Sequence, residues 1–353
     1  MQSSSARSGK GGRGELAIIR HIRSQAGHSN SRAVRLGIGD DCALLRPRAG
    51  QELAVTTDLT IAGTHFRMDW HAPESAGHRA LARGLSDLAA MGAVPVAAFL
   101  SLGLPRELAH PKGRWETSWA ARFLDGLLAL ARAHKTPLAG GDLSETPVLL
   151  ADIVLIGSLP AGKALLRSSA RAGDLLYVTG VLGGGAASLP FLDRLAKAGS
   201  GGQMGLNLRR IPKNLGPLLE RHLWPQPRLA QGIRLRGQGL ASAAIDLSDG
   251  LSTDLTHLCE ESRVAAEIDP ALLPVNPGAN LDYALHGGDD YELLFTAPAN
   301  VHMPRKIAGV AITRIGRILP ARSDQAAVTI LTPRGPQPLK PRGWEHFSET
   351  SQG

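Results

Sequence analysis

Cysteines and aromatic residues are scarce in this 353-residue sequence, and long apolar runs are missing. The two cysteines, Cys42 and Cys259, form no CxxC pair and no plausible disulfide framework, which favours a reducing, cytoplasmic location. No run of about 18 apolar residues occurs, so we expect no membrane-spanning helix and no membrane partner. Aromatic residues make up 4% of the chain, too few for a surface that stacks the bases of single-stranded nucleic acid.

The first residues, MQSSSARSGKGGRG, are basic and polar and have no apolar core of the kind found in a secretory signal. This segment is rich in Gly and Ser and contains almost nothing that a core could bury. We therefore expect residues 1–14 to form a disordered tail.

The chain carries 39 Lys and Arg against 31 Asp and Glu, a formal charge of +8. Much of the excess lies in residues 205–236, which hold seven basic residues and the single acid Glu220. A solvated helix surface explains this stretch, and so does a phosphate-facing role. A non-catalytic nucleic-acid-binding protein that uses residues 205–236 is one alternative, although it leaves the acidic motifs described below unexplained.

A chain of this length exceeds the roughly 250–300 residues at which one core stops growing, so two domains are expected. Pro, Gly and Ser cluster in residues 159–171 and predict a boundary there, which separates an N-terminal domain (15–160) from a C-terminal domain (161–353). Helical and strand patterns alternate in both, so the fold class is α/β (α+β). We expect helices at 14–22, 78–92 and 114–135, strands at 34–39, 42–46, 53–58, 94–104, 148–159, 291–297, 310–318 and 326–331, and strand–turn–helix units at 171–189 and 242–262.

Two glycine-containing motifs suggest phosphate binding but are weak. GSLPAGKA (157–164) has the spacing of a P-loop, but Ala164 stands where a magnesium-binding Ser or Thr is needed. GGG (183–185) follows a predicted strand, and it fits either a phosphate-cradling turn or a turn that needs positive φ.

Acidic residues at strand ends form a stronger pattern. They recur in GIGDDCAL, TTDLTIAGTHF, GLSDLAAMG, AGGDLSE, IDLSDGLS and HGGDDYELLF. Magnesium takes oxygen ligands, usually one or two carboxylates together with substrate phosphates and waters. The residues that fit this chemistry are Asp40, Asp41, Thr56, Thr57, Asp58, Asp87, Asp142, Asp246 and Asp249.

Each of these acids also has a purely structural explanation. Asp41 fits an Asx turn, Asp87 fits an ion pair with Arg83 one helical turn earlier, and Ser248 or Asp249 fits a helix cap. Asp142 fits ordinary turn chemistry. Independent turns would not all repeat one Gly-rich, acid-bearing, strand-terminal form, so the set as a whole predicts a divalent-metal phosphate site.

Six of these motifs, in this order, resemble the thiamine-monophosphate kinase family, a branch of the superfamily that includes aminoimidazole ribonucleotide synthetase and selenophosphate synthetase. The resemblance runs from Glu15 to Phe347. It implies a two-domain α/β protein whose N-terminal domains pair in a homodimer, with strands of both chains forming a barrel. It also implies thiamine diphosphate biosynthesis by direct in-line transfer of the γ-phosphoryl group of ATP to thiamine monophosphate.

The resemblance further implies site residues. Several Mg²⁺ ions would be held by Asp41, Thr56, Thr57, Asp58, Asp87, Asp142, Asp246 and Asp249. ATP would contact Gly141, Asp142, Arg167 and Ser248, and thiamine monophosphate would contact His65, Asp289 and Trp344. The catalytic set would be Asp41, Asp58, Asp87, Asp142, Arg167 and Asp246. No general base is required, because the acceptor phosphate is already ionised near neutral pH, so positioning and charge neutralisation supply most of the rate.

One position departs from the family motif GGEDYEL. The chain has GGDDYEL, so Asp289 replaces a glutamate that is expected to contact the pyrimidine ring. The missing methylene shortens the reach of the carboxylate by about 1.5 Å.

Other enzyme classes remain open at this point. Residues 8–14 have no reactive cysteine of the kind expected in selenophosphate synthetase, and AGTHF and GWEHF are not expected in aminoimidazole ribonucleotide synthetase. A metal-dependent phosphohydrolase would share the acids but would hydrolyse ATP without an acceptor.

Overall fold

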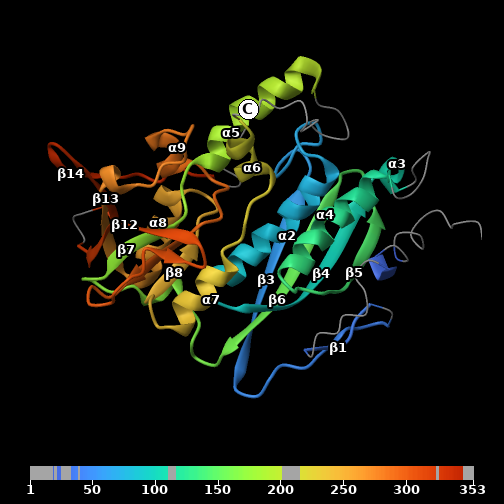
Figure 1. Cartoon of the computed structure of the whole chain (residues 1–353), viewed down its shortest axis with the longest axis horizontal. Helices are drawn as coiled ribbons and strands as arrows, with labels where there is room; N and C mark the ends of the chain where they lie inside the picture. Colours follow the sequence, from blue (N-terminus) through green and yellow to red (C-terminus); the bar gives the residue numbers. More distant parts are fainter. Residues whose placement is uncertain are drawn as a thin grey trace, which may run out of the picture.

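The computed structural model describes residues 19, 22–24, 33–38, 40–109, 117–200, 215–322 and 326–344. The expected tail at 1–14, most of the expected helix at 14–22, and the first basic residues of the 205–236 stretch lie outside these residues. The described chain forms two sheet-based units, with the α/β class confirmed (Figure 1).

The first unit contains a four-stranded sheet in the order β3-β6-β4-β5. Its strands are β3 (Gln51–Ile61), β4 (Val94–Leu104), β5 (Leu138–Glu145) and β6 (Leu150–Pro160). β6 pairs antiparallel with both β3 and β4, whereas β5 runs parallel to β4. The parallel step requires a crossover, which α3 (Arg106–Ala109) and α4 (Trp119–Ala133) supply. A two-stranded sheet of β1 (Val34–Leu36) and β2 (Leu44–Leu45) precedes it.

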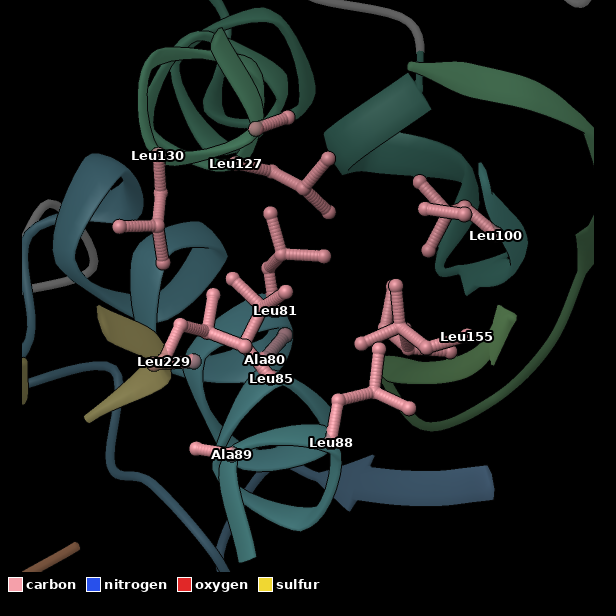
Figure 2. Packing of buried hydrophobic residues seen from close by; sticks show 14 of the residues in the cluster. Ala80, Leu81, Leu85, Leu88, Ala89, Leu100, Leu127, Leu130, Leu155 and Leu229 are labelled. Carbon is pink, nitrogen blue, oxygen red and sulfur yellow. The ribbon is translucent and has the colours of Figure 1, made fainter. Parts of the chain in front are cut away.

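Helices α2 (Pro73–Ala90) and α4 pack together on one face of this sheet. Pro73 begins α2, which suits its fixed φ and missing N–H. Leu81, Leu85 and Leu88 point from α2 into the core that Leu155 of β6 shares (Figure 2). Gly77 and Gly126 let the two helices approach closely, because a Cβ at either position would overlap backbone of the other helix. The expected strand at 94–104 is confirmed as β4, while the expected helix at 78–92 begins five residues earlier, at Pro73.

The second unit is built on a sheet in the order β14-β13-β9-β12-β7-β10-β8, with β11 beside β12. Its strands are β7 (Leu175–Thr179), β8 (Ala243–Asp246), β9 (Val264–Ile268), β10 (Leu293–Ala297), β11 (Lys306–Ile307), β12 (Val310–Pro320), β13 (Val328–Thr332) and β14 (Gly335–Pro338). Its helices are η2 (Arg167–Ser169), α5 (Gly184–Leu195), η3 (Ala196–Ser200), α8 (Leu251–Ser262), η5 (Pro270–Leu272) and α9 (Leu281–His286). The strand–turn–helix units expected at 171–189 and 242–262 are therefore present as β7–α5 and β8–α8.

Helices α6 (Gly216–Leu223) and α7 (Leu229–Gly237) lie between the two units (Figure 1). Ser75 Oγ of α2 donates to the carbonyl of Leu223 at 2.7 Å, and Arg236 donates to the carbonyl of Gly92 at 2.8 Å. A continuous apolar core runs from α2 and α4 to Phe295 of the second sheet. The two units are thus joined by buried contacts, which fixes the walls of the space between them.

The predicted boundary at 160/161 lies where β6 of the first sheet ends, and β7 of the second sheet begins at Leu175. The domain limits themselves stay a prediction. Among the described residues, no helix is long and apolar enough to cross a membrane.

Candidate active site

A cleft of about 770 Å³ opens between the two units. Its walls come from β3, α2 and the loop between them on one side, and from the turns after β8 and before β10 on the other. Nine of the residues predicted to form the site line it: Thr57, Asp58, His65, Asp87, Asp246, Ser248, Asp249, Asp289 and Trp344. Residues far apart in sequence are therefore brought to one cleft.

Three carboxylates form an acidic wall at one end of the cleft. Asp58 lies on β3, Asp87 on α2 and Asp246 at the end of β8. Thr56 Oγ1 donates to Asp87 at 2.5 Å, and Ser86 Oγ donates to Asp246 at 2.8 Å, which links α2 to both sheets. Alternation along β3 sends Thr56 and Asp58 to the helix-covered face and Thr57 to the other.

The pKa values of all three carboxylates are raised, so the charged form of each is disfavoured in the folded protein. Burial, opposed by Arg83 and reinforced by Asp87, raises the pKa of Asp58 to about 6. Burial and the neighbouring Asp87 raise the pKa of Asp246 to about 7, and burial raises the pKa of Asp87 as well. Buried carboxylates that raise one another's pKa form a site that a cation stabilises.

Oxygen donors of this kind suit magnesium, although no three His, Cys, Asp or Glu side chains of the described residues are arranged to hold an ion by themselves. Magnesium normally takes one or two carboxylates and completes its octahedron with waters and substrate phosphates. The donor set therefore fits an ion that arrives with a phosphate-bearing substrate.

The turn after β8 carries Ser248 and Asp249 into the cleft. The explanation of either as a helix cap is wrong, since α8 begins after Gly250 and has no side-chain N-cap. Asp254 performs that task, accepting the N–H groups of Asp249 and Gly250 at 3.2 and 3.0 Å.

The opposite end of the cleft centres on Asp289. Its Oδ2 accepts from Arg79 at 2.9 Å and its Oδ1 accepts from the Tyr291 hydroxyl at 2.8 Å. Nδ1 of His222 lies 3.4 Å from Oδ2 of Asp289. Burial disfavours the carboxylate charge, but Arg79, His222 and Tyr291 together hold the pKa of Asp289 well below its usual range.

Ring side chains line the cleft beside Asp289. Phe66, Trp70, His71 and His222 gather there, with the two histidine ring centroids 5.2 Å apart. Burial lowers the pKa of both histidines, so both imidazoles are neutral at pH 7. The predicted residue His65 accepts the Ile61 N–H at its Nδ1 (3.1 Å), which places its proton on Nε2.

Trp344 reaches the cleft through a fixed backbone. Its N–H donates to the carbonyl of Asp249 at 3.1 Å, and the N–H of Gly343 donates to Thr253 Oγ1 at 3.0 Å. A Cβ on Gly343 would overlap the Asp249 carbonyl and the Thr253 hydroxyl. The last described residues are thereby fastened to the N-terminus of α8.

Other predicted site residues lie away from the cleft lining. Asp41 and Asp142 are exposed, and Gly141 on β5 packs against the backbone of Leu100. The N–H of Asp41 is bonded to the carboxylate of Asp40 at 2.9 Å. Arg167, in η2, is exposed, and its charge partly opposes the rise in the pKa of Asp87 and of Asp246.

Neither glycine motif forms an open phosphate site. The segment 157–164 ends β6 and turns at Gly162, without opening a helix there. At GGG, Gly183 has φ of 84° and begins α5, as a positive-φ turn requires. The N–H groups of Gly183 and Gly185 donate to Asp290 at 2.7 and 3.4 Å, so the helix N-terminus already binds a carboxylate of the same chain.

The cleft also contains three residues that were not predicted from the sequence, Arg79, Tyr291 and His222. Arg83 Nη2 contacts Asp58 Oδ1 at 2.8 Å, so Arg83 pairs with Asp58 and not with Asp87, the partner offered by the structural alternative. The spacing of Arg79, Arg83 and Asp87, one helical turn apart, was the available signal. It places all three on one face of α2, which is the face that lines the cleft.

A family model and a curated relative both match this chain. Residues 39–159 match the family model described as AIR synthase related protein, N-terminal domain. The chain is 38% identical over 348 residues to the thiamine-monophosphate kinase of Escherichia coli K12, with 95% of this chain and 98% of that protein covered. The chain belongs to the thiamine-monophosphate kinase family.

Solved structures agree. The thiamine-monophosphate kinase of Stenotrophomonas maltophilia K279a superposes with a TM-score of 0.75 at 38% identity, covering 90% of this chain and 96% of that one. AaThiL complexed with AMPPCP and TMP superposes with a TM-score of 0.71 at 30% identity, covering 95% and 97%.

Proposed function

We propose that this protein transfers the γ-phosphoryl group of ATP to thiamine monophosphate. An oxygen of the acceptor phosphate forms a bond to the γ-phosphorus as the bond from that phosphorus to the β–γ bridging oxygen breaks, giving thiamine diphosphate and ADP. Family membership and the relative complexed with AMPPCP and TMP support both substrates. The observation that carries the proposal is a single cleft with an acidic wall at one end and ring side chains around Asp289 at the other.

Magnesium fits the acidic wall, where Asp58, Asp87, Asp246 and Asp249 would hold it. When bound, it supplies positive charge that neutralises the phosphate oxygens during transfer. Thr56, whose hydroxyl is bonded to Asp87, orients that carboxylate, and Thr57 remains a predicted ligand at the cleft edge. Asp41 and Asp142 remain predicted ligands, as do Gly141 and Ser248 for ATP.

The opposite end suits the two rings of thiamine. Trp344, with 49% of its surface exposed, offers an aromatic face that attracts the cationic thiazolium. His65 and Asp289 offer hydrogen bonds to the aminopyrimidine. Arg167 lies near the acidic wall, where it would stabilise charge on the transferring group.

A product assay tests the proposal. The purified protein is incubated with ATP, Mg²⁺ and thiamine monophosphate, and thiamine diphosphate and ADP are quantified by chromatography. Equal amounts of both products, lost on addition of a chelator, are expected. ADP without thiamine diphosphate would instead identify a phosphohydrolase or an enzyme with another acceptor.

A homodimer is also proposed, from exposed apolar residues on β3 of the first sheet. Leu53, Val55 and Leu59 alternate along β3 and are 43%, 61% and 45% exposed. They lie on the face opposite α2, and no described element covers them. A second copy of the same sheet would bury them. Val55→Asp should give a monomer by light scattering, whereas Leu272→Asp, at an equally exposed site outside β3, should not.

The nucleic-acid alternative loses much of its basis in the described residues. Arg228 pairs with the fully buried Glu292 at 2.5 Å, Arg221 lies 3.7 Å from the same carboxylate, and Arg236 bonds to Gly92. The described basic residues of this stretch thus largely hold α6 and α7 between the two units. The cytoplasmic location expected from the cysteines stays a prediction.

A further inference from the structure

Arg83 is one of the residues that line the cleft. It lies one helical turn after Arg79 and one before Asp87 on the cleft face of α2. Its side chain is 19% exposed and its partner Asp58 is 16% exposed, so their 2.8 Å ion pair is largely shielded from solvent. The guanidinium therefore lies in a wall that otherwise carries several carboxylates.

The surroundings of Arg83 are acidic on both sides. Burial opposes its charge, but Tyr291, Asp58, Asp289 and Asp87 together raise its pKa. Asp58 and Asp87 belong to the acidic wall, whereas Tyr291 and Asp289 belong to the opposite end of the cleft, beside the ring side chains. Arg83 is thus placed at the junction where, under the proposed function, the phosphate of thiamine monophosphate meets the γ-phosphoryl group.

Arg79 and Arg83 differ in how many contacts their guanidinium groups make within the protein. Arg79 is 2% exposed, and it donates to the carbonyl of His222 and to the carboxylate of Asp289. Arg83 has one ion pair among the described contacts, to Asp58. A guanidinium has five N–H donors in a planar fork that matches phosphate, so donors remain for a ligand after a single contact.

We propose that Arg83 is a further catalytic residue that binds the phosphate of the acceptor, with Asp58 holding the guanidinium in place before substrate arrives. This inference rests on the proposed function. The acceptor phosphate would approach the carboxylates of Asp58 and Asp87, and Arg83 adds positive charge beside them in addition to the charge of a metal ion. Arg83 forms no covalent bond; it neutralises and orients the attacking phosphate.

Binding measurements without ATP isolate this role. The dissociation constants of thiamine monophosphate and of thiamine are measured by calorimetry in magnesium buffer for the wild-type protein, Arg83→Met and Arg83→Lys. The two ligands differ only in the phosphate. Arg83→Met should weaken thiamine monophosphate by roughly 10- to 100-fold, the range of a lost charged hydrogen bond, and leave thiamine unchanged. Arg83→Lys should recover part of the loss.

A matched control is Arg106→Met, which removes another arginine–carboxylate pair, with Glu145, outside the cleft. It should change neither constant. If Arg83→Met binds thiamine monophosphate as the wild type does, or weakens both ligands equally, the role of Arg83 is overturned while the proposed function stands. If the wild-type protein binds neither ligand, the proposed function fails and this inference with it.

Discussion

Arg79 of α2 and Asp289 of the loop before β10 form a 2.9 Å ion pair across the cleft. The same guanidinium bonds to the backbone of His222, in α6. One side chain of the first unit thereby fixes both α6 and the loop before β10. Asp289 of the GGDDYEL motif is held by protein groups on both of its oxygens, so its carboxylate is fixed at the end of the cleft opposite the acidic wall.

Arg79→Met should lower stability markedly. Arg79 is 2% exposed and Asp289 is 32% exposed, so removing the guanidinium leaves a partly exposed carboxylate without its closest cation, which costs about 1–3 kcal/mol. Chemical denaturation followed by circular dichroism measures the change. Arg106→Met, at an exposed pair, should shift the free energy of unfolding by less than about 1 kcal/mol. Equal effects in the two variants would contradict the assigned importance of the Arg79–Asp289 pair.

Asp58→Ala and Asp41→Ala should each abolish turnover. Asp41→Ala should keep its stability, whereas Asp58→Ala should also lower it, because Arg83 loses its ion-pair partner. Asp58 belongs to the acidic wall, and removing a carboxylate that is proposed to hold a metal ion should reduce kcat by about 100-fold. Thiamine diphosphate formation and the melting temperature are measured together. Glu145→Ala, at an exposed acid outside the cleft, is the control. A fully active Asp41→Ala protein would exclude Asp41, which lies outside the cleft lining, while leaving Asp58 in place.

The strands and the acidic motifs could be predicted from the sequence because each depends on local chemistry. β4 is an apolar run that could be recognised from its own residues. The acids at strand ends share one Gly-rich form, which could also be recognised locally. The partners of the charges could not be predicted. Arg83 pairs with Asp58 of β3 instead of Asp87 on its own helix. This happens because β3 packs against the face of α2 that carries Arg83 and Asp87. The bonds from the N–H groups of Gly183 and Gly185 to Asp290 also depend on long-range packing, so they could not be predicted.

Asp290 should make stability depend on pH. Burial raises its pKa from 3.8 to about 7 despite the N–H groups of Gly183 and Gly185. The folded state then holds a proton that the unfolded state releases, so this contribution to stability is present at low pH and is lost as pH rises from about 4 to 7. Asp290→Asn lacks the charge. Its melting temperature relative to wild type should therefore rise by a few degrees between pH 5 and pH 8.

Differential scanning fluorimetry at both pH values measures the Asp290 effect as a difference, so that other titrating groups cancel. Asp282→Asn, at an exposed acid, should show no such pH-dependent difference. A difference for Asp290→Asn that is constant with pH would show that the carboxyl group does not titrate in this range.

Gly343→Ala should impair binding of the acceptor without affecting ATP. A Cβ at residue 343 overlaps the Asp249 carbonyl and the Thr253 hydroxyl, so the chain must move away from α8 and carry Trp344 with it. The KM for thiamine monophosphate should rise about 10-fold, in line with the loss of one aromatic–cation contact, while the KM for ATP stays unchanged. Thr253→Val, which removes only the hydroxyl bonded to Gly343, should produce a smaller rise in the same constant. Steady-state kinetics with each substrate varied in turn distinguishes this from a general loss of fold, which would change both constants. An unchanged KM for thiamine monophosphate in both variants would show that the position of Trp344 does not matter for acceptor binding.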